Sequence, residues 1–78
     1  MSNYKTLDWL NLRSEPIVQS GNILGVMPPD TIVEKIDNGS LPDWFRIKVR
    51  MRSTEMQGFA SANFLEETIH AQDEQNDD

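Results

Sequence analysis

The segment 44–52 constrains the fold of this chain most strongly, because its side chains alternate between two kinds. Its odd positions are apolar, and its even positions after Trp44 are basic. A β-strand points successive side chains to opposite faces, whereas a helix of 3.6 residues per turn would mix the two kinds. We therefore predict a strand with Phe45, Ile47, Val49 and Met51 in the core and Trp44, Arg46, Lys48, Arg50 and Arg52 on the outer face.

Shorter apolar or alternating runs, separated by turn signals, predict the other strands. Asn38-Gly39 favours a hairpin turn, and Pro28-Pro29 ends a strand because proline lacks the amide hydrogen of the ladder. Residues 61–63 are compatible with a single 3₁₀ turn. Without a long helical pattern or a repeat, the chain is predicted to be all-β. Strands are expected at 10–13, 23–27 with a bulge at Gly25, 31–36, 44–52, 56–60 and 64–65, with a turn at 53–55.

The residue types present argue against an active site or a bound metal. The chain has 78 residues, no cysteine and a single histidine, His70. Nucleophilic catalysis needs a nucleophile beside a base, and metal binding needs several converging ligands. The acids in the body flank turns and a short strand, where carboxylates are usually solvated. We therefore expect no enzymatic activity, no catalytic residue, no cofactor and no metal.

The charge is unevenly distributed and indicates how the chain is organised. Residues 1–65 hold seven acids and seven bases, so the formal net charge of −6 lies entirely in residues 66–78. We predict an N-terminal extension at 1–8, one globular domain at 9–65, and a flexible, disordered acidic tail at 66–78 that is either a linker or a solubilising terminus. No segment is apolar enough for a signal peptide or a membrane span. A cytoplasmic location is expected, or the cell envelope or exterior if Met1 is not the natural start.

Three segments, in order, resemble the bacterial Src homology 3 family. Leu10-Asn11-Leu12-Arg13-Ser14-Glu15-Pro16 is similar to the family's opening Leu-Asn-Val-Arg-x-x-Pro motif. Asp43-Trp44-Phe45-Arg46-Ile47 is similar to its Gly-Trp-Tyr-Lys-Val strand, and Gly58-Phe59-Ala60-Ser61-Ala62-Asn63-Phe64-Leu65 to its closing Gly-Trp-Val-x-x-x-Tyr-Leu segment. The resemblance covers nearly all of residues 9–65. It implies a small SH3-like barrel of five to six strands, and cell-wall peptides as the ligand class.

These observations predict a non-catalytic binding module that is part of a larger protein. The module is expected to recognise an extended peptide. The peptide is expected in a shallow groove between the loop after Arg13 and the hairpin near Trp44. Trp44 has two open interpretations, a ligand anchor or a side chain packed on the barrel surface, whereas packing is preferred for Trp9. Proline-rich ligands are not expected, since Tyr4 is the only tyrosine. The expected ligand-binding residues are Trp44, Arg46, Lys48, Arg13, Asn11, Phe59 and Asn63.

Two other functions remain as alternatives. The first is an intracellular interaction or assembly domain without a cell-wall role, which would form homodimers or docking surfaces through edge strands. The second, weaker alternative is a nucleic-acid binder that uses the basic outer face of 46–52 beside Trp44. Against it, the body is neutral, and Glu34 and Asp37 are expected to screen these bases across the hairpin.

Overall fold

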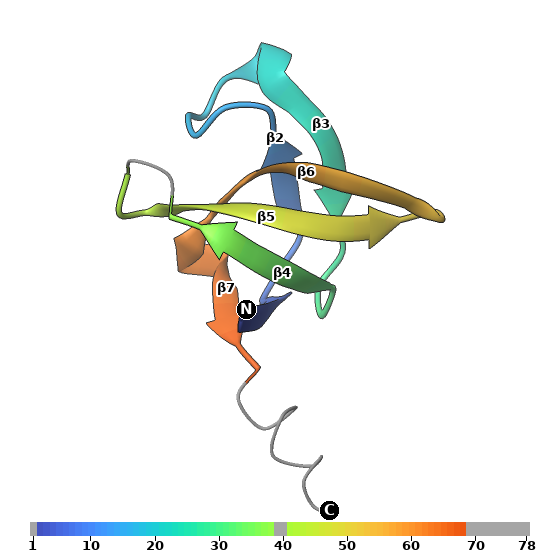
Figure 1. The fold of residues 1–78 in the computed structure, drawn as a ribbon. Coiled ribbons are helices and arrows are strands. Elements are labelled where there is room, and N and C mark those ends of the chain that lie inside the picture. Colours follow the sequence, from blue (N-terminus) through green and yellow to red (C-terminus); the bar gives the residue numbers. More distant parts are fainter. Residues whose placement is uncertain (1, 39–40, 69–78) are drawn as a thin grey trace, which may run out of the picture.

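Seven antiparallel strands form one sheet in the part of the chain that the computed structural model describes, residues 2–38 and 41–68 (Figure 1). The all-β prediction is therefore confirmed. The sheet order is β3-β2-β6-β5-β4-β1-β7. The strands are β1 (Ser2–Thr6), β2 (Leu10–Arg13), β3 (Ile23–Met27), β4 (Ile32–Asp37), β5 (Trp44–Met51), β6 (Thr54–Ser61) and β7 (Leu65–Glu67), with 3₁₀ turns η1 (Ser20–Asn22) and η2 (Ala62–Phe64).

Short connections force this sheet to curl. The pairs β1–β2, β3–β4 and β6–β7 each follow one another in the chain but lie four places apart in the sheet. Four strand spacings on a flat sheet measure about 19 Å. The four residue steps from Thr6 to Leu10, or from Ser61 to Leu65, reach at most about 14 Å. The sheet must therefore bend back on itself, and in Figure 1 β2 and β3 run across β5 and β6.

Thr6 fastens one of these bends. Its hydroxyl donates to the carbonyl of Pro28 at 2.6 Å and accepts from the amide of Thr31 at 2.9 Å. Its backbone carbonyl accepts from the amide of Asp30 at 2.8 Å, where the chain turns with a φ of 67°. Because Thr6 is fully buried, these bonds are shielded from water and hold the β3–β4 connection against the end of β1.

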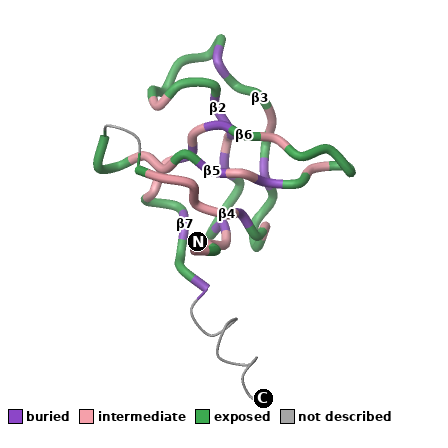
Figure 2. Tube along the Cα trace, in the orientation of Figure 1, coloured by how far each residue is buried: buried purple, intermediate pink, exposed green. Residues whose placement is uncertain are grey.

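The core lies inside the curl and uses the predicted face of β5. Ile47 and Val49 are buried, and Phe45 and Met51 pack against them from the same strand, as the alternation predicts. Figure 2 shows the buried segments concentrated where β5 and β6 cross β2. The buried apolar residues are Leu10, Leu12, Met27, Val33, Ile47, Val49, Ala60 and Leu65.

The sheet differs from the predicted barrel in closure and extent. Among the described residues no pairing joins the end strands β3 and β7, so hydrogen bonds do not close it into a barrel. It has seven strands rather than five or six, because β1 lies within the expected N-terminal extension 1–8 and β7 runs into the expected tail 66–78. Apart from Glu66, Glu67 and Thr68, that tail lies outside the described residues. β1 escaped prediction because it is polar and inserts between β4 and β7 by backbone pairing.

Local details also differ from the sequence-based expectation. The β5–β6 turn is at Arg52 and Ser53, both with positive φ, rather than at 53–55, so Arg52 is not part of the strand. The register between β2 and β3 shifts so that Leu24, not Gly25, is the unpaired residue. The predicted β4–β5 hairpin is present, but Gly39 of its expected Asn38-Gly39 turn lies outside the described residues.

Candidate functional site

A pocket of about 230 Å³ opens between the β2–β3 loop and the segment where β5 begins and β6 ends, next to η2. It lies where the sequence places the groove, between the loop after Arg13 and Trp44. Trp44 enters from the start of β5, opposite Ser61 at the end of β6. The backbone amide of Ala62 donates to the carbonyl of Asp43 at 2.9 Å and holds the start of β5 against the end of β6. The pocket is lined by Trp9, Leu10, Asn11, Arg13, Val18, Trp44, Ser61 and Phe64.

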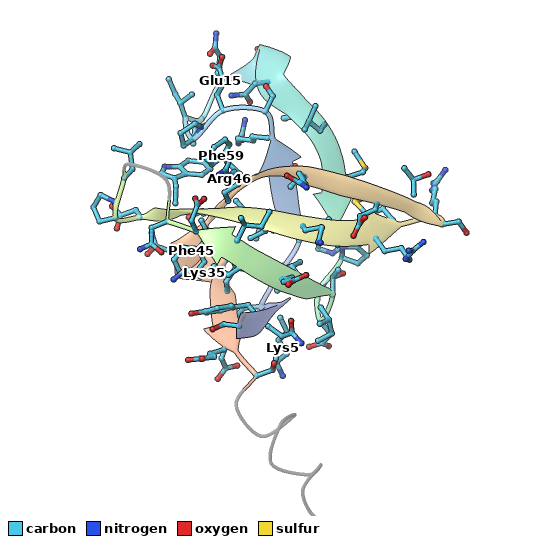
Figure 3. The ribbon with its side chains drawn as sticks, viewed as in Figure 1. Lys5, Glu15, Lys35, Phe45, Arg46 and Phe59 are labelled. Atoms are coloured by element: carbon cyan, nitrogen blue, oxygen red, sulfur yellow. The ribbon has the colours of Figure 1, made fainter. Side chains whose placement is uncertain are left out.

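The structure brings three of the seven expected binding residues together at this pocket. They are Trp44, Arg13 and Asn11. The other four do not line it: Arg46, Lys48, Phe59 and Asn63. Figure 3 shows Phe59 beside Arg46 on the outer face, where the two residues are register partners on β6 and β5. Asn63 is exposed on η2.

Sequence reasoning missed several of the residues that line the pocket. Trp9 was expected to be packed, yet it is 65% exposed and lies on the pocket wall. It precedes β2, where its backbone amide donates to the Asp8 side chain and its neighbour Leu10 occupies the core instead. Val18 and Phe64 are also exposed and complete the apolar wall. Exposure of Trp9 follows from the β1–β2 bend, which no local pattern reports.

The β2–β3 loop is held in place by a buried hydrogen-bond network centred on Arg13. The Nη1 of Arg13 donates to the carbonyl of Gln19 and to the Oδ1 of Asn22, both at 2.9 Å. Asn22 in turn donates from Nδ2 to the carbonyl of Ile17 at 3.0 Å. Both Arg13 and Asn22 are buried. Because these bonds connect residues 17–22 to one another and to Arg13, they fix the position of Val18 beside the pocket.

The basic outer face of β5 is largely neutralised by acids on its neighbours. Arg46 donates to Asp37 from both Nε and Nη2, the shorter contact being 2.6 Å. The Nζ of Lys48 lies 3.7 Å from Glu34 and 3.6 Å from Glu55. The predicted screening by Glu34 and Asp37 is therefore confirmed. Arg50 and Arg52 make no ion pair with any described residue.

An aromatic pair on the inner face of the sheet packs against the core and has a structural role. The rings of Tyr4 and Phe45 meet edge to face with centroids 5.1 Å apart. The Nζ of Lys35 lies 4.3 Å from the centre of the Phe45 ring, and Figure 3 shows these two side chains together. A cation over an aromatic face is attracted by the ring's electron density. This contact retains Lys35 on the inner face, next to the core.

No family model matches the chain, and neither a curated protein nor a solved structure matches it significantly. In residues 2–38 and 41–68, no group of three or more His, Cys, Asp or Glu side chains converges to hold a metal. Nor does this part of the chain contain a helix long and apolar enough to cross a membrane. His70 lies outside it.

Proposed function

We propose that this chain is a non-catalytic binding module of the bacterial Src homology 3 type, which takes an extended peptide into the pocket beside Trp44. The observation that carries the proposal is the aromatic wall of the pocket, where Trp9 and Phe64 are exposed and Trp44 is half-buried. Exposed aromatic side chains gathered around a hollow are costly in water and are typical anchors of protein interfaces. The sequence resemblance favours a cell-wall peptide as the ligand, bound by this module as part of a larger protein.

The polar groups around the pocket suit a peptide backbone. Asn11 and Ser61 lie on its walls between the aromatic residues. An asparagine amide both donates and accepts hydrogen bonds, and a serine hydroxyl does the same. A pocket with apolar walls and a few polar groups is typical of sites that bind small ligands or peptide segments. The braced β2–β3 loop keeps Val18 in position before the ligand arrives, which lowers the entropy cost of binding.

The test is the affinity of the Trp44→Ala variant for a synthetic cell-wall stem peptide. If Trp44 anchors the ligand, its truncation should cost about 2 kcal/mol or more, roughly a thirtyfold loss of affinity. Isothermal titration calorimetry measures this loss directly. In parallel, amide spectra of the wild type should show shifts at Asn11 and at the indole groups of Trp9 and Trp44.

The matched control is Ile32→Ala. Ile32 is 55% exposed on β4 and does not line the pocket, so its truncation should leave affinity unchanged. Equal affinity of the wild type and Trp44→Ala would refute this placement of the site. A wild type that binds no wall peptide at all would refute the ligand class.

An assembly domain is the second candidate, and the free edge of β3 favours it. Within residues 2–38 and 41–68, β3 pairs only with β2; it carries no charged residue, and Ile23, Leu24 and Val26 are exposed on it. Hollows lined partly by Leu24, Val26 and Met51 run alongside this strand. An uncharged edge can pair with its own copy without opposing like charges. The other end strand, β7, carries Glu66 and Glu67 and would repel a second copy.

Nucleic-acid binding has less support. Of the four basic side chains expected in the outer row, Arg46 and Lys48 are engaged by acids. Fewer free cations mean fewer counterions released from a polyanion, and so a weaker driving force for binding.

A further inference from the structure

Arg13 is a buried cation whose charge no described side chain neutralises. The residue is only 8% exposed, and no carboxylate of residues 2–38 or 41–68 lies within ion-pair distance of it. Glu15, the acid in the same loop, points outward at the far end of that loop in Figure 3. The side chain of Arg13 donates instead to two neutral oxygens, those of Gln19 and Asn22. A buried charge without a counter-charge is costly to the fold.

The hydrogen-bond donors of Arg13 are also incompletely used. A guanidinium has five N–H groups. Both hydrogen bonds of this side chain are donated by Nη1, so the three N–H groups on Nε and Nη2 have no partner among the described residues. The Nε and Nη2 groups form one edge of the planar guanidinium, which matches the two oxygens of a carboxylate. Because Nη1 is fixed by the loop, the plane of the group is fixed before any ligand binds.

The pocket around Arg13 favours an anionic ligand. Arg13 lines the pocket beside Trp44, and it is the only charged residue among the described residues that do so. The other walls are aromatic, aliphatic or neutral polar. A charge-assisted hydrogen bond is stronger where the surroundings exclude water. The pocket therefore combines apolar anchors with one fixed cation.

We propose that the pocket selects peptides with a carboxylate, which the Nε and Nη2 edge of Arg13 binds with two parallel hydrogen bonds. The inference rests on the proposed peptide-binding function and specifies its ligand class. The carboxylate belongs either to a peptide C-terminus or to an acidic side chain, next to an apolar residue held by Trp9 and Trp44. A cell-wall stem peptide carries carboxylates of both kinds, and so do many other acidic peptides.

The test varies the ligand, so it does not depend on whether an Arg13 variant folds. Four forms of one synthetic stem peptide are compared by calorimetry: the parent, its C-terminal amide, its Glu→Gln analogue and the doubly changed peptide. Loss of the bound carboxylate should weaken binding roughly tenfold or more, as expected for a charge-assisted pair. Whichever single change produces the loss identifies the source of the carboxylate. In the wild type, the Nε–H resonance of Arg13 should shift with the parent peptide and not with the doubly changed one.

Matched variants distinguish two parallel hydrogen bonds from the fixed Arg13 side chain from a general attraction between opposite charges. Arg13→Gln should bind all four peptides with equal affinity, whereas Arg52→Gln, which removes an exposed cation outside the pocket, should keep the discrimination. Equal affinity of the wild type for all four peptides would overturn the carboxylate inference and leave the peptide-binding proposal standing. Discrimination that disappears in Arg52→Gln would overturn it too. Absence of binding to every form would instead refute the wall-peptide ligand class of the proposed function.

Discussion

Arginine residues on the outer face of this sheet serve opposite purposes according to what covers them. Alternation alone places Arg13 and Arg46 on the same face, where each is a register partner of Phe59. Arg46 is exposed and paired with Asp37, an interaction that stabilises a surface only slightly. Arg13 is covered by the β2–β3 loop and becomes the centre of a hydrogen-bond network. Cover by a loop, rather than residue type, decides which arginine is buried and which stays at the surface.

Gly58 permits the close approach of β6 to β2 beneath Arg13. A Cβ atom at this position would lie 2.7 Å from the Arg13 carbonyl and 3.0 Å from the Cδ1 of Leu12. The backbone oxygen cannot move without disturbing the sheet, so Gly58→Ala should lower the free energy of unfolding by about 1–3 kcal/mol. Urea denaturation measures the change.

Gly21→Ala is the control, since nothing lies within 4 Å of its added methyl group. It should change stability by less than about 0.5 kcal/mol. Equal effects at Gly58 and Gly21 would contradict the close approach of β6 to β2.

At the scale of the element, β3 is the strand whose surroundings the sequence describes least well. Its apolar run reads as a buried strand, yet four of its five residues are exposed or half-buried. It lies at the end of the sheet, so in the described part of the chain one row of its backbone groups has no strand beside it. An apolar edge of this kind is a template for pairing with another chain.

If β3 mediates self-association, a charge on it should abolish the dimer. In a dimer formed by two β3 strands related by a two-fold axis, Val26→Lys would place two positive charges close together. Natural edge strands often carry lysine, which prevents them from pairing with another chain. Sedimentation velocity should then show a concentration-dependent dimer for the wild type and a monomer for Val26→Lys. Ile32→Lys, an exposed change on a strand paired on both sides, should remain dimeric. A wild type that is monomeric at every concentration would refute assembly through the edge of β3.

The whole molecule depends on contacts between the two ends of the described chain. β1 lies between β4 and β7 and pairs with both. Thr68 is buried and donates from its backbone amide and its hydroxyl to the carbonyl of Asn3, each at 3.0 Å. The folding unit is therefore wider than the 9–65 boundary that the sequence motifs suggest.

Truncation tests this wider boundary. A chain that lacks residues 1–8 loses β1 and the fully buried Thr6, and should not show a cooperative unfolding transition. A chain that ends at Thr68 keeps every strand pairing described here, and should unfold with the midpoint of the full chain. Circular dichroism during heating distinguishes the two outcomes. Cooperative unfolding of the chain without residues 1–8 would contradict an integral role for β1.

The sequence by itself determined the strand character of most of the body and the inner face of β5. These properties depend on residues one or two positions apart, which a period of two reveals. Trp44, Arg13 and Asn11, three of the binding residues predicted from the sequence, line the same pocket. Only the tertiary structure decided the insertion of β1, the exposure of Trp9 and the burial of Arg13. Each of these depends on where a short connection or a loop brings distant residues together, and the curl of the sheet sets those positions rather than any local pattern.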